Sequence, residues 1–307
     1  MGTLVGHVAH GVGFVLIGLW HLYNNIKLHS LHPKGYRSLI WFAAPKLRQL
    51  ELLVIASGSC VSITMELFVG PDRHQPLDYD FTIPSNHLQN FDHAFMSLTF
   101  LLYATFAAAL DRANPARPAA EPLTILAAST AFAQELLLFH LHSSDHVGVE
   151  GQYHWLLQLV IAVSLATTLM GIGHPRSFAV AFVRSLTIAF QGIWLIIMGY
   201  ALYMPSLMSK GCFINPESGH MVVRCRSQEA LHRAKALVNF EFCWLLVAVL
   251  AASLLFYLLL SRRYAEEAEY ASIVKLVDDD VEDLDVEANM RSFVSMGKTM
   301  RSMDLEM

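Results

Sequence analysis

Four histidines lie close together in the stretch FHLHSSDHVGVEGQYHWLLQ, between two segments that are otherwise apolar enough to cross a membrane. They are His140, His142, His146 and His154, and Asp145 and Glu150 lie among them. Neutral imidazole is the commonest protein ligand of transition metals, and zinc held by three protein ligands and a water can act as a hydrolytic centre. Ionisable side chains near the mouth of a transmembrane bundle are costly to desolvate, so they usually have a partner or a function. This stretch is therefore the first candidate for chemistry in the chain.

Further ionisable residues recur at the spacing of one helix face. Residues three, four or seven apart share a face of an α-helix. His93 follows Asn90 by three residues, and His142 follows Glu135 by seven. We expect such polar stripes to face inward and to meet in one pocket on the side of the membrane assigned below to the lumen. The candidate ligands of zinc or another transition metal are His93, His140, His142, His146, His154, Glu66, Glu135 and Glu150.

A structural interpretation of the same residues stays open beside the metal site. The chain has no H-E-x-x-H pair, and the pattern H-x-H-x3-H from 140 to 146 is only suggestive. The histidines could lie among lipid headgroups, where polar side chains cost little. Glu66 and Glu135 could each be satisfied by an interhelical hydrogen bond, worth roughly 0.6 kcal/mol on average. The candidate partners for these two carboxyl groups are Asn90, Gln134 and Gln191.

The elements that must position these residues are membrane-spanning helices. The chain has 307 residues, 54% of them hydrophobic and only 15% charged, whereas a soluble domain carries about 25% charged residues. A helix that crosses the bilayer needs roughly 20 mostly apolar residues. Seven segments approach that length, near 5–24, 50–69, 91–110, 123–142, 153–172, 185–204 and 236–260. The sequence therefore predicts an all-α, polytopic membrane protein, with residues 1–263 forming a seven-helix transmembrane domain.

The basic residues predict how this domain is oriented. Eleven Lys and Arg fall on the side of the 24–50 loop and six on the opposite side, which favours a lumenal or extracellular N-terminus and a cytosolic C-terminus. Cys212 and Cys225 lie in a loop assigned to the lumenal side, where a disulfide can form. Whether they are bridged stays open from the sequence. Gly2, Gly6 and Gly13, at steps of four and seven residues, predict a close-packing face on the first helix.

The C-terminal segment has a different composition. Residues 264–307 contain twelve acidic and four basic residues. Such a segment is too acidic to fold alone, so we expect a largely disordered cytosolic tail. Tyr270-Ala-Ser-Ile273 fits a tyrosine-based sorting pattern that would bind a cytosolic adaptor, although patterns this short arise often by chance. No basic aromatic surface suggests nucleic acid, and the expected partner is the lipid bilayer.

Several segments resemble one known family. They are the start MGTLVGHVAHGVGFVLIGLW, the second apolar run with Glu66, the segment HLQNFDHAFMSL, and QELLLFHLHSSDHVGVEGQYHWLLQ. In order and spacing they resemble the transmembrane protein 45 family, also called domain of unknown function 716, over roughly residues 1–262, and they suggest a plant-type member. The resemblance implies a seven-helix membrane protein without an agreed activity. The positions that match the family's polar pattern are Glu66, His93, Glu135, His140, His142, Glu150 and His154.

Three classes of function remain open from the sequence. The first is a non-enzymatic role in trafficking, assembly or stress response, in the endomembrane system or the plasma membrane. The second is a metal-binding protein or a zinc-dependent membrane hydrolase that uses the histidine cluster. The third is a proton or metal-ion transporter that uses Glu66 and Glu135. The cytosolic half of the spans is expected to be apolar apart from its basic fringe, with Gln191 nearly its only polar candidate, which weakens the third class.

Overall fold

The computed structural model describes residues 3–70, 74–113, 119–142, 148–217 and 220–264. Within these residues, seven helices are long and apolar enough to cross a membrane. They are α1 (Leu4–Leu31), α2 (Leu50–Thr64) continued by a π-helix (Met65–Val69), α3 (Leu88–Ala113) after a short 3-10 turn (Ser85–His87), α4 (Ala120–His142), α5 (Val149–Gly173), α6 (Phe178–Tyr203), and a C-terminal helix (Gln228–Tyr264). The predicted all-α membrane fold is confirmed. The adaptor motif Tyr270–Ile273 and nearly all of the acidic tail lie outside the described residues.

The helices are longer than their apolar cores, because polar residues at their ends still support helix. The Thr3 side chain caps α1 by accepting a hydrogen bond from the Gly6 amide at 3.1 Å. The helix then continues to Leu31, since the next proline is Pro33. The C-terminal helix has 37 residues, so it is about 55 Å long and exceeds the thickness of a bilayer core.

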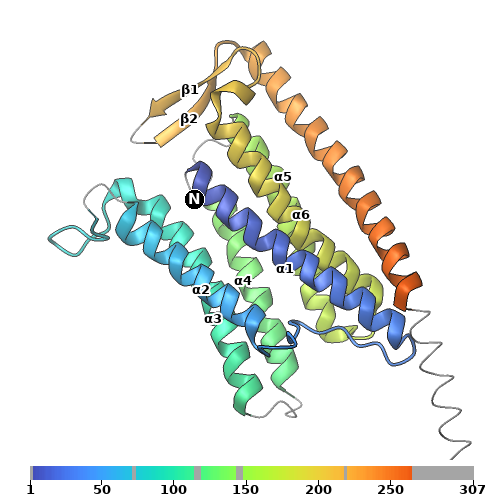
Figure 1. The fold of residues 1–307 in the computed structure, drawn as a ribbon. Helices are drawn as coiled ribbons and strands as arrows, with labels where there is room; N and C mark the ends of the chain where they lie inside the picture. Colours follow the sequence, from blue (N-terminus) through green and yellow to red (C-terminus); the bar gives the residue numbers. More distant parts are fainter. Residues whose placement is uncertain (1–2, 71–73, 114–118, 143–147, 218–219, 265–307) are drawn as a thin grey trace, which may run out of the picture.

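Close packing of α1 on α6 organises the bundle (Figure 1). The two helices run antiparallel and meet at glycines. A Cβ added at Gly18 would lie 2.3 Å from the backbone nitrogen of Ala189, and one at Gly11 would lie 2.6 Å from the carbonyl oxygen of Gly192. Only residues without a side chain allow backbones to approach this closely. The packing face of α1 therefore contains Gly11 and Gly18, whereas a Cβ added at Gly13 would meet nothing within 4 Å.

The remaining helices form a continuous series around a central core. α2 packs along α3, α4 lies between α3 and α5, and α5 packs on α6. The largest buried apolar cluster surrounds Trp194 on α6 and includes Phe132, Tyr153 and Leu157. Although α1 and α2 are consecutive in the chain, they contact each other little. In Figure 1 the α2–α3 pair stands apart from α1 on one side of the bundle.

A β-hairpin covers one end of α5 and α6. Strands β1 (Cys212–Glu217) and β2 (His220–Cys225) pair antiparallel, and a disulfide joins Cys212 to Cys225. Arg224 forms an ion pair with Glu217 at 2.5 Å. Hydrogen bonds from Arg224 and Asn215 lower the pKa of the Glu217 carboxyl to about 2. We call the end of the bundle with Thr3, Val69 and this hairpin the hairpin end, and the end with residues 32–49 the loop end.

Candidate functional site

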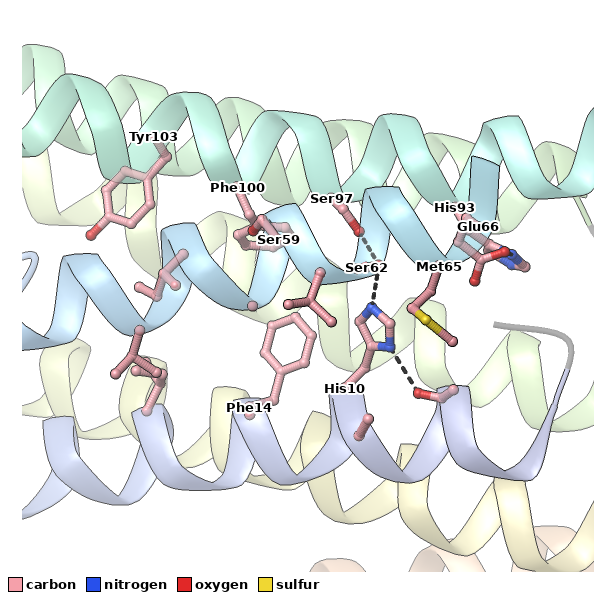
Figure 2. Close-up of a pocket in the computed structure, with 18 of the residues that line it drawn as sticks. His10, Phe14, Ser59, Ser62, Met65, Glu66, His93, Ser97, Phe100 and Tyr103 are labelled. Carbon is pink, nitrogen blue, oxygen red and sulfur yellow. Dashed lines mark hydrogen bonds and ion pairs between the residues drawn. The ribbon is translucent and has the colours of Figure 1, made fainter. Parts of the chain in front are cut away.

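A cavity of about 860 Å³ lies between α1 on one side and α2 and α3 on the other. Figure 2 shows His10 and Phe14 of α1 facing side chains of α2 and α3 across it. The cavity reaches from Thr3 and Asn86 at the hairpin end to His21 and Arg184 at the loop end. Its volume lies within the range of small-molecule binding sites. We call it the intramembrane groove.

Two glycines keep this groove open. Gly13 of α1 and Gly58 of α2 both line it, and a Cβ added at either one would meet nothing within 4 Å. The middle of the groove is mainly apolar, with Phe14, Phe100 and Phe132 among its walls, and Ser59 is a polar residue beside Phe100. The two helices α1 and α2 therefore contact each other little because an open space, lined mainly by apolar side chains, lies between them.

Toward the hairpin end, a chain of hydrogen bonds crosses the groove (Figure 2). His10 Nε2 lies 2.9 Å from Ser62 Oγ, and Ser62 Oγ lies 2.7 Å from Ser97 Oγ. His10 Nδ1 lies 2.8 Å from the carbonyl oxygen of Gly6. A carbonyl oxygen can only accept, so Nδ1 carries the hydrogen, and Nε2 of the neutral ring accepts from the Ser62 hydroxyl. Ser62 is then free to accept a hydrogen bond from Ser97.

Glu66 lies beyond this chain at the hairpin end, where α2 becomes a π-helix. The amide of Gly70 donates to the carbonyl of Met65 at 2.7 Å, which is the wider hydrogen bond of a π turn. Asn90 Nδ2 donates to Glu66 Oε2 at 3.1 Å, and His93 Nδ1 lies 3.5 Å from the same oxygen. The structure therefore brings together Glu66 and His93 with the predicted partner Asn90, and all three line the groove.

The loop end of the groove is polar. The sequence had instead predicted that the spans are apolar on the side of the 24–50 loop. His21 Nε2 lies 2.7 Å from Glu51 Oε1, and the Phe42 amide donates to Glu51 Oε2 at 2.8 Å. Arg184, which is 2% exposed, donates to Ser38 Oγ at 3.0 Å and to the carbonyl of Leu39 at 2.6 Å. The sequence did not indicate this cluster, because Arg184 is one of the eleven basic residues that were counted beside the membrane on the side of the 24–50 loop. The available signal was His21, an ionisable residue in the last turn of the first apolar run.

Tyr36 shows how the 32–49 segment folds into the protein at this end. Its hydroxyl donates to Asn25 Oδ1 at 2.8 Å, and Asn25 donates to Ser185 Oγ at 3.1 Å. Tyr36 is 3% exposed, and burial raises the pKa of its hydroxyl to about 12. The segment is thus attached to α1 and α6 through Tyr36, and its Ile40 lines the groove.

The other predicted site residues do not join the groove. Glu135 of α4 is 1% exposed and accepts a hydrogen bond from Gln191 at 2.6 Å, as the structural interpretation anticipated. His140 pairs with Gln158 at 3.3 Å, and the ring of His154 lies 5.5 Å from that of Phe139. Glu150 lies in the first turn of α5. His146 and the side chain of His142 lie outside what the structure describes.

The candidate residues that the structure describes therefore do not meet in one pocket, contrary to the expectation from the sequence. Only Glu66 and His93 line the groove, while Glu135, His140 and His154 are distributed over α4 and α5. In the described part of the chain, no group of three or more His, Cys, Asp or Glu residues could hold a metal ion. Polar stripes on separate helices had suggested one meeting point. The helices are rotated so that the stripes face different neighbours.

The fold and the groove together define a multi-pass integral membrane protein with an internal cavity between its helices. Residues 121–258 match the model of a family of unknown function, DUF716, which is the transmembrane protein 45-type family. The matched segment contains α4, α5, α6, the hairpin and most of the C-terminal helix. The groove, by contrast, is formed mainly by α1, α2 and α3, which precede that segment.

Proposed function

We propose that the protein binds a bilayer lipid, with an acyl chain in the middle of the intramembrane groove and the polar part at the hairpin end. The carrying observation is the order of side chains along the groove. Hydrogen-bonding residues lie at the hairpin end, aromatic and aliphatic residues follow, and a second polar cluster closes the loop end. An amphiphile matches this order because its apolar chain avoids water while its polar part keeps hydrogen bonds.

The groove also communicates with the surface that would face lipid. Val54, Val61 and Met65 line it, and each is 45% exposed or more. These residues belong to α2, on the side where α1 and α2 scarcely touch. A lipid could therefore enter sideways between the two helices without leaving the bilayer.

The order of polar and apolar side chains along the groove argues against the ion-transport hypothesis. His10 and His21 are the polar residues of α1 that line the groove on either side of its middle, and they are eleven residues apart. This separation corresponds to about 16 Å along the helix. Phe14 and Ile17 occupy this interval on α1, and such apolar side chains disfavour the passage of a proton or a metal ion.

The proposal includes a biological role and an orientation in the membrane. A lipid-binding membrane protein agrees with a role in trafficking, assembly or stress response. We retain a lumenal or extracellular N-terminus and a cytosolic C-terminus, which would place the hairpin end in the outer half of the membrane.

Lipid capture by variants that fill the groove tests this function. The full-length protein would be purified in detergent and exposed to a photoreactive single-chain lipid. Leucine at Gly13 and Gly58 would extend into open space, so Gly13→Leu combined with Gly58→Leu should reduce crosslinking at least tenfold without loss of folding. Gly173→Leu is the matched control, because a Cβ there also meets nothing within 4 Å and Gly173 does not line the groove. Equal crosslinking in the double variant and the control would refute the proposal.

A further inference from the structure

We propose that Ser62 is a nucleophile activated by His10, and that this pair cleaves the acyl ester of a lipid bound in the groove. This inference rests on the proposed lipid binding and adds a reaction to it. A serine becomes a nucleophile when a base accepts its proton and a third group orients that base. His10 and the Gly6 carbonyl occupy these two positions relative to Ser62.

The direction of the hydrogen bonds is the one that the reaction needs. Because Nδ1 of His10 donates to the Gly6 carbonyl at 2.8 Å, Nε2 presents its lone pair to Ser62 at 2.9 Å. This separation is within the range for a base that takes a proton from a hydroxyl. Ser97, at 2.7 Å from Ser62, can donate to the Ser62 oxygen and hold it toward His10. We assign Ser97 as a positioning residue.

The location of Ser62 and His10 differs from that of an ordinary hydrogen bond at the protein surface. Ser62 and Ser97 are 7% and 5% exposed, and both line the groove with His10. Ser59, three residues earlier on α2, lines the groove on the same face. The π-helix Met65–Val69 begins three residues after Ser62, and such interruptions are frequent at functional sites. Buried hydroxyls next to a lipid-sized space can meet a substrate that water-facing serines cannot.

The reaction balances with water as its only co-reactant. Ser62 Oγ attacks the ester carbonyl carbon and forms a C–O bond, while its proton moves to His10 Nε2. Collapse of the tetrahedral intermediate breaks the bond to the leaving alcohol, which takes that proton from His10. The acyl group is now an ester of Ser62. A water gives a proton to His10 Nε2 and attacks the carbonyl carbon of this ester. The bond to Ser62 Oγ then breaks, the fatty acid is released, and His10 returns the proton to Ser62 Oγ.

The position of Ser62 along the groove indicates the class of substrate. Ser62 lies seven residues before Val69, the last residue of the span, which corresponds to about 10 Å. Glu66 and His93 lie toward that end and form a polar cluster with Asn90, whereas Phe14 and Phe100 lie in the other direction. The acyl chain would therefore extend toward the loop end. The alcohol part would be polar, as in a glycerolipid, and would point toward the hairpin end.

Active-site labelling tests this inference. The full-length protein in detergent would be treated with a long-chain fluorophosphonate, which forms a stable bond with an activated serine, and the modified peptide would be identified by mass spectrometry. We expect labelling at Ser62, its loss in Ser62→Ala, and a rate at least 100-fold lower in His10→Gln. Ser57→Ala is the matched control, since Ser57 lies on the exposed face of α2 and bonds to the Val54 carbonyl. A parallel assay would follow release of fatty acid from a monoacylglycerol in mixed micelles.

The variant Ser97→Ala separates chemistry from folding. It breaks the same chain of hydrogen bonds as Ser62→Ala but keeps the nucleophile, so it should retain labelling at a reduced rate. Absence of labelling at Ser62 in protein that still crosslinks to lipid would overturn the reaction and leave lipid binding intact. An unchanged labelling rate in His10→Gln would overturn the role of His10. Loss of lipid crosslinking in folded wild-type protein would instead overturn the proposed function.

Discussion

His21 of α1 and Glu51 of α2 form a buried pair, with Nε2 and Oε1 2.7 Å apart and both side chains at most 4% exposed. The other Glu51 oxygen accepts a hydrogen bond from the Phe42 amide at 2.8 Å. One carboxyl group thus joins α1, the 32–49 segment and α2. At the other end of the groove, His10 and Ser62 make a second link between the same two helices. The two links hold the walls of the groove at both ends while its middle stays open.

We expect Glu51→Ala to destabilise the protein strongly. The substitution leaves His21 and the Phe42 amide without their buried acceptor, and removal of one partner from such a pair costs about 3–5 kcal/mol. Glu51→Gln keeps two polar atoms at the site and should cost less. The measurement is the midpoint of unfolding by denaturing detergent. Arg37→Ala is the comparison, because its ion pair with Glu121 is solvent-exposed and should contribute under about 1 kcal/mol. Similar midpoints for Glu51→Ala and Arg37→Ala would contradict this account.

Gly18→Leu should disrupt the contact between α1 and α6. A Cβ at Gly18 lies 2.3 Å from the Ala189 nitrogen, so the two backbones must separate. Overpacking inside a tight interface costs about 1–3 kcal/mol, occasionally more. We expect a lower thermal midpoint and a lower yield of monodisperse protein. The same substitution at Gly13 enters open space and should be tolerated. If both variants were equally stable, the assigned packing face would be wrong.

The hairpin disulfide and the orientation can be tested together. Oxidised Cys212 and Cys225 should resist maleimide labelling until a reductant is added, while Cys60 and Cys243 are free thiols. Removing the bridge by Cys212→Ser with Cys225→Ser should lower stability by about 2–4 kcal/mol. A protease added to intact cells or sealed vesicles reports which compartment holds the N-terminus. Labelling of Cys212 or Cys225 without reductant would contradict the bridge. An N-terminus on the cytosolic face would contradict the orientation.

The pair of Glu135 and Gln191 should behave as a structural contact. Gln191→Leu removes the 2.6 Å hydrogen bond to a carboxyl group that is 1% exposed. An unsatisfied buried polar group costs about 1–3 kcal/mol, so the variant should unfold at lower denaturant. Adding Glu135→Leu should restore part of the loss, because both polar groups are then gone. Lipid crosslinking in the double variant should remain at the wild-type level, since neither residue lines the groove. A loss of crosslinking in a folded double variant would contradict the conclusion that Glu135 and Gln191 lie outside the lipid-binding groove.

The sequence by itself determined the spans, because the bilayer requires about 20 apolar residues for each crossing. It also determined local relationships. Asn90 and His93, three residues apart, share a face of α3 and both contact Glu66. Such relationships depend only on the helical repeat, which is the same in every α-helix.

Only the tertiary structure decided which polar faces meet. His10 and Ser62 are 52 residues apart, and His21 and Glu51 are 30 apart. Their pairing depends on how each helix is rotated about its axis, and close approach of glycines such as Gly11 and Gly192 sets that rotation. A polar residue in an apolar run shows that a partner is needed, but its identity comes from the packing of the neighbouring helix. For the same reason the predicted single cluster of histidines and glutamates became several separate contacts.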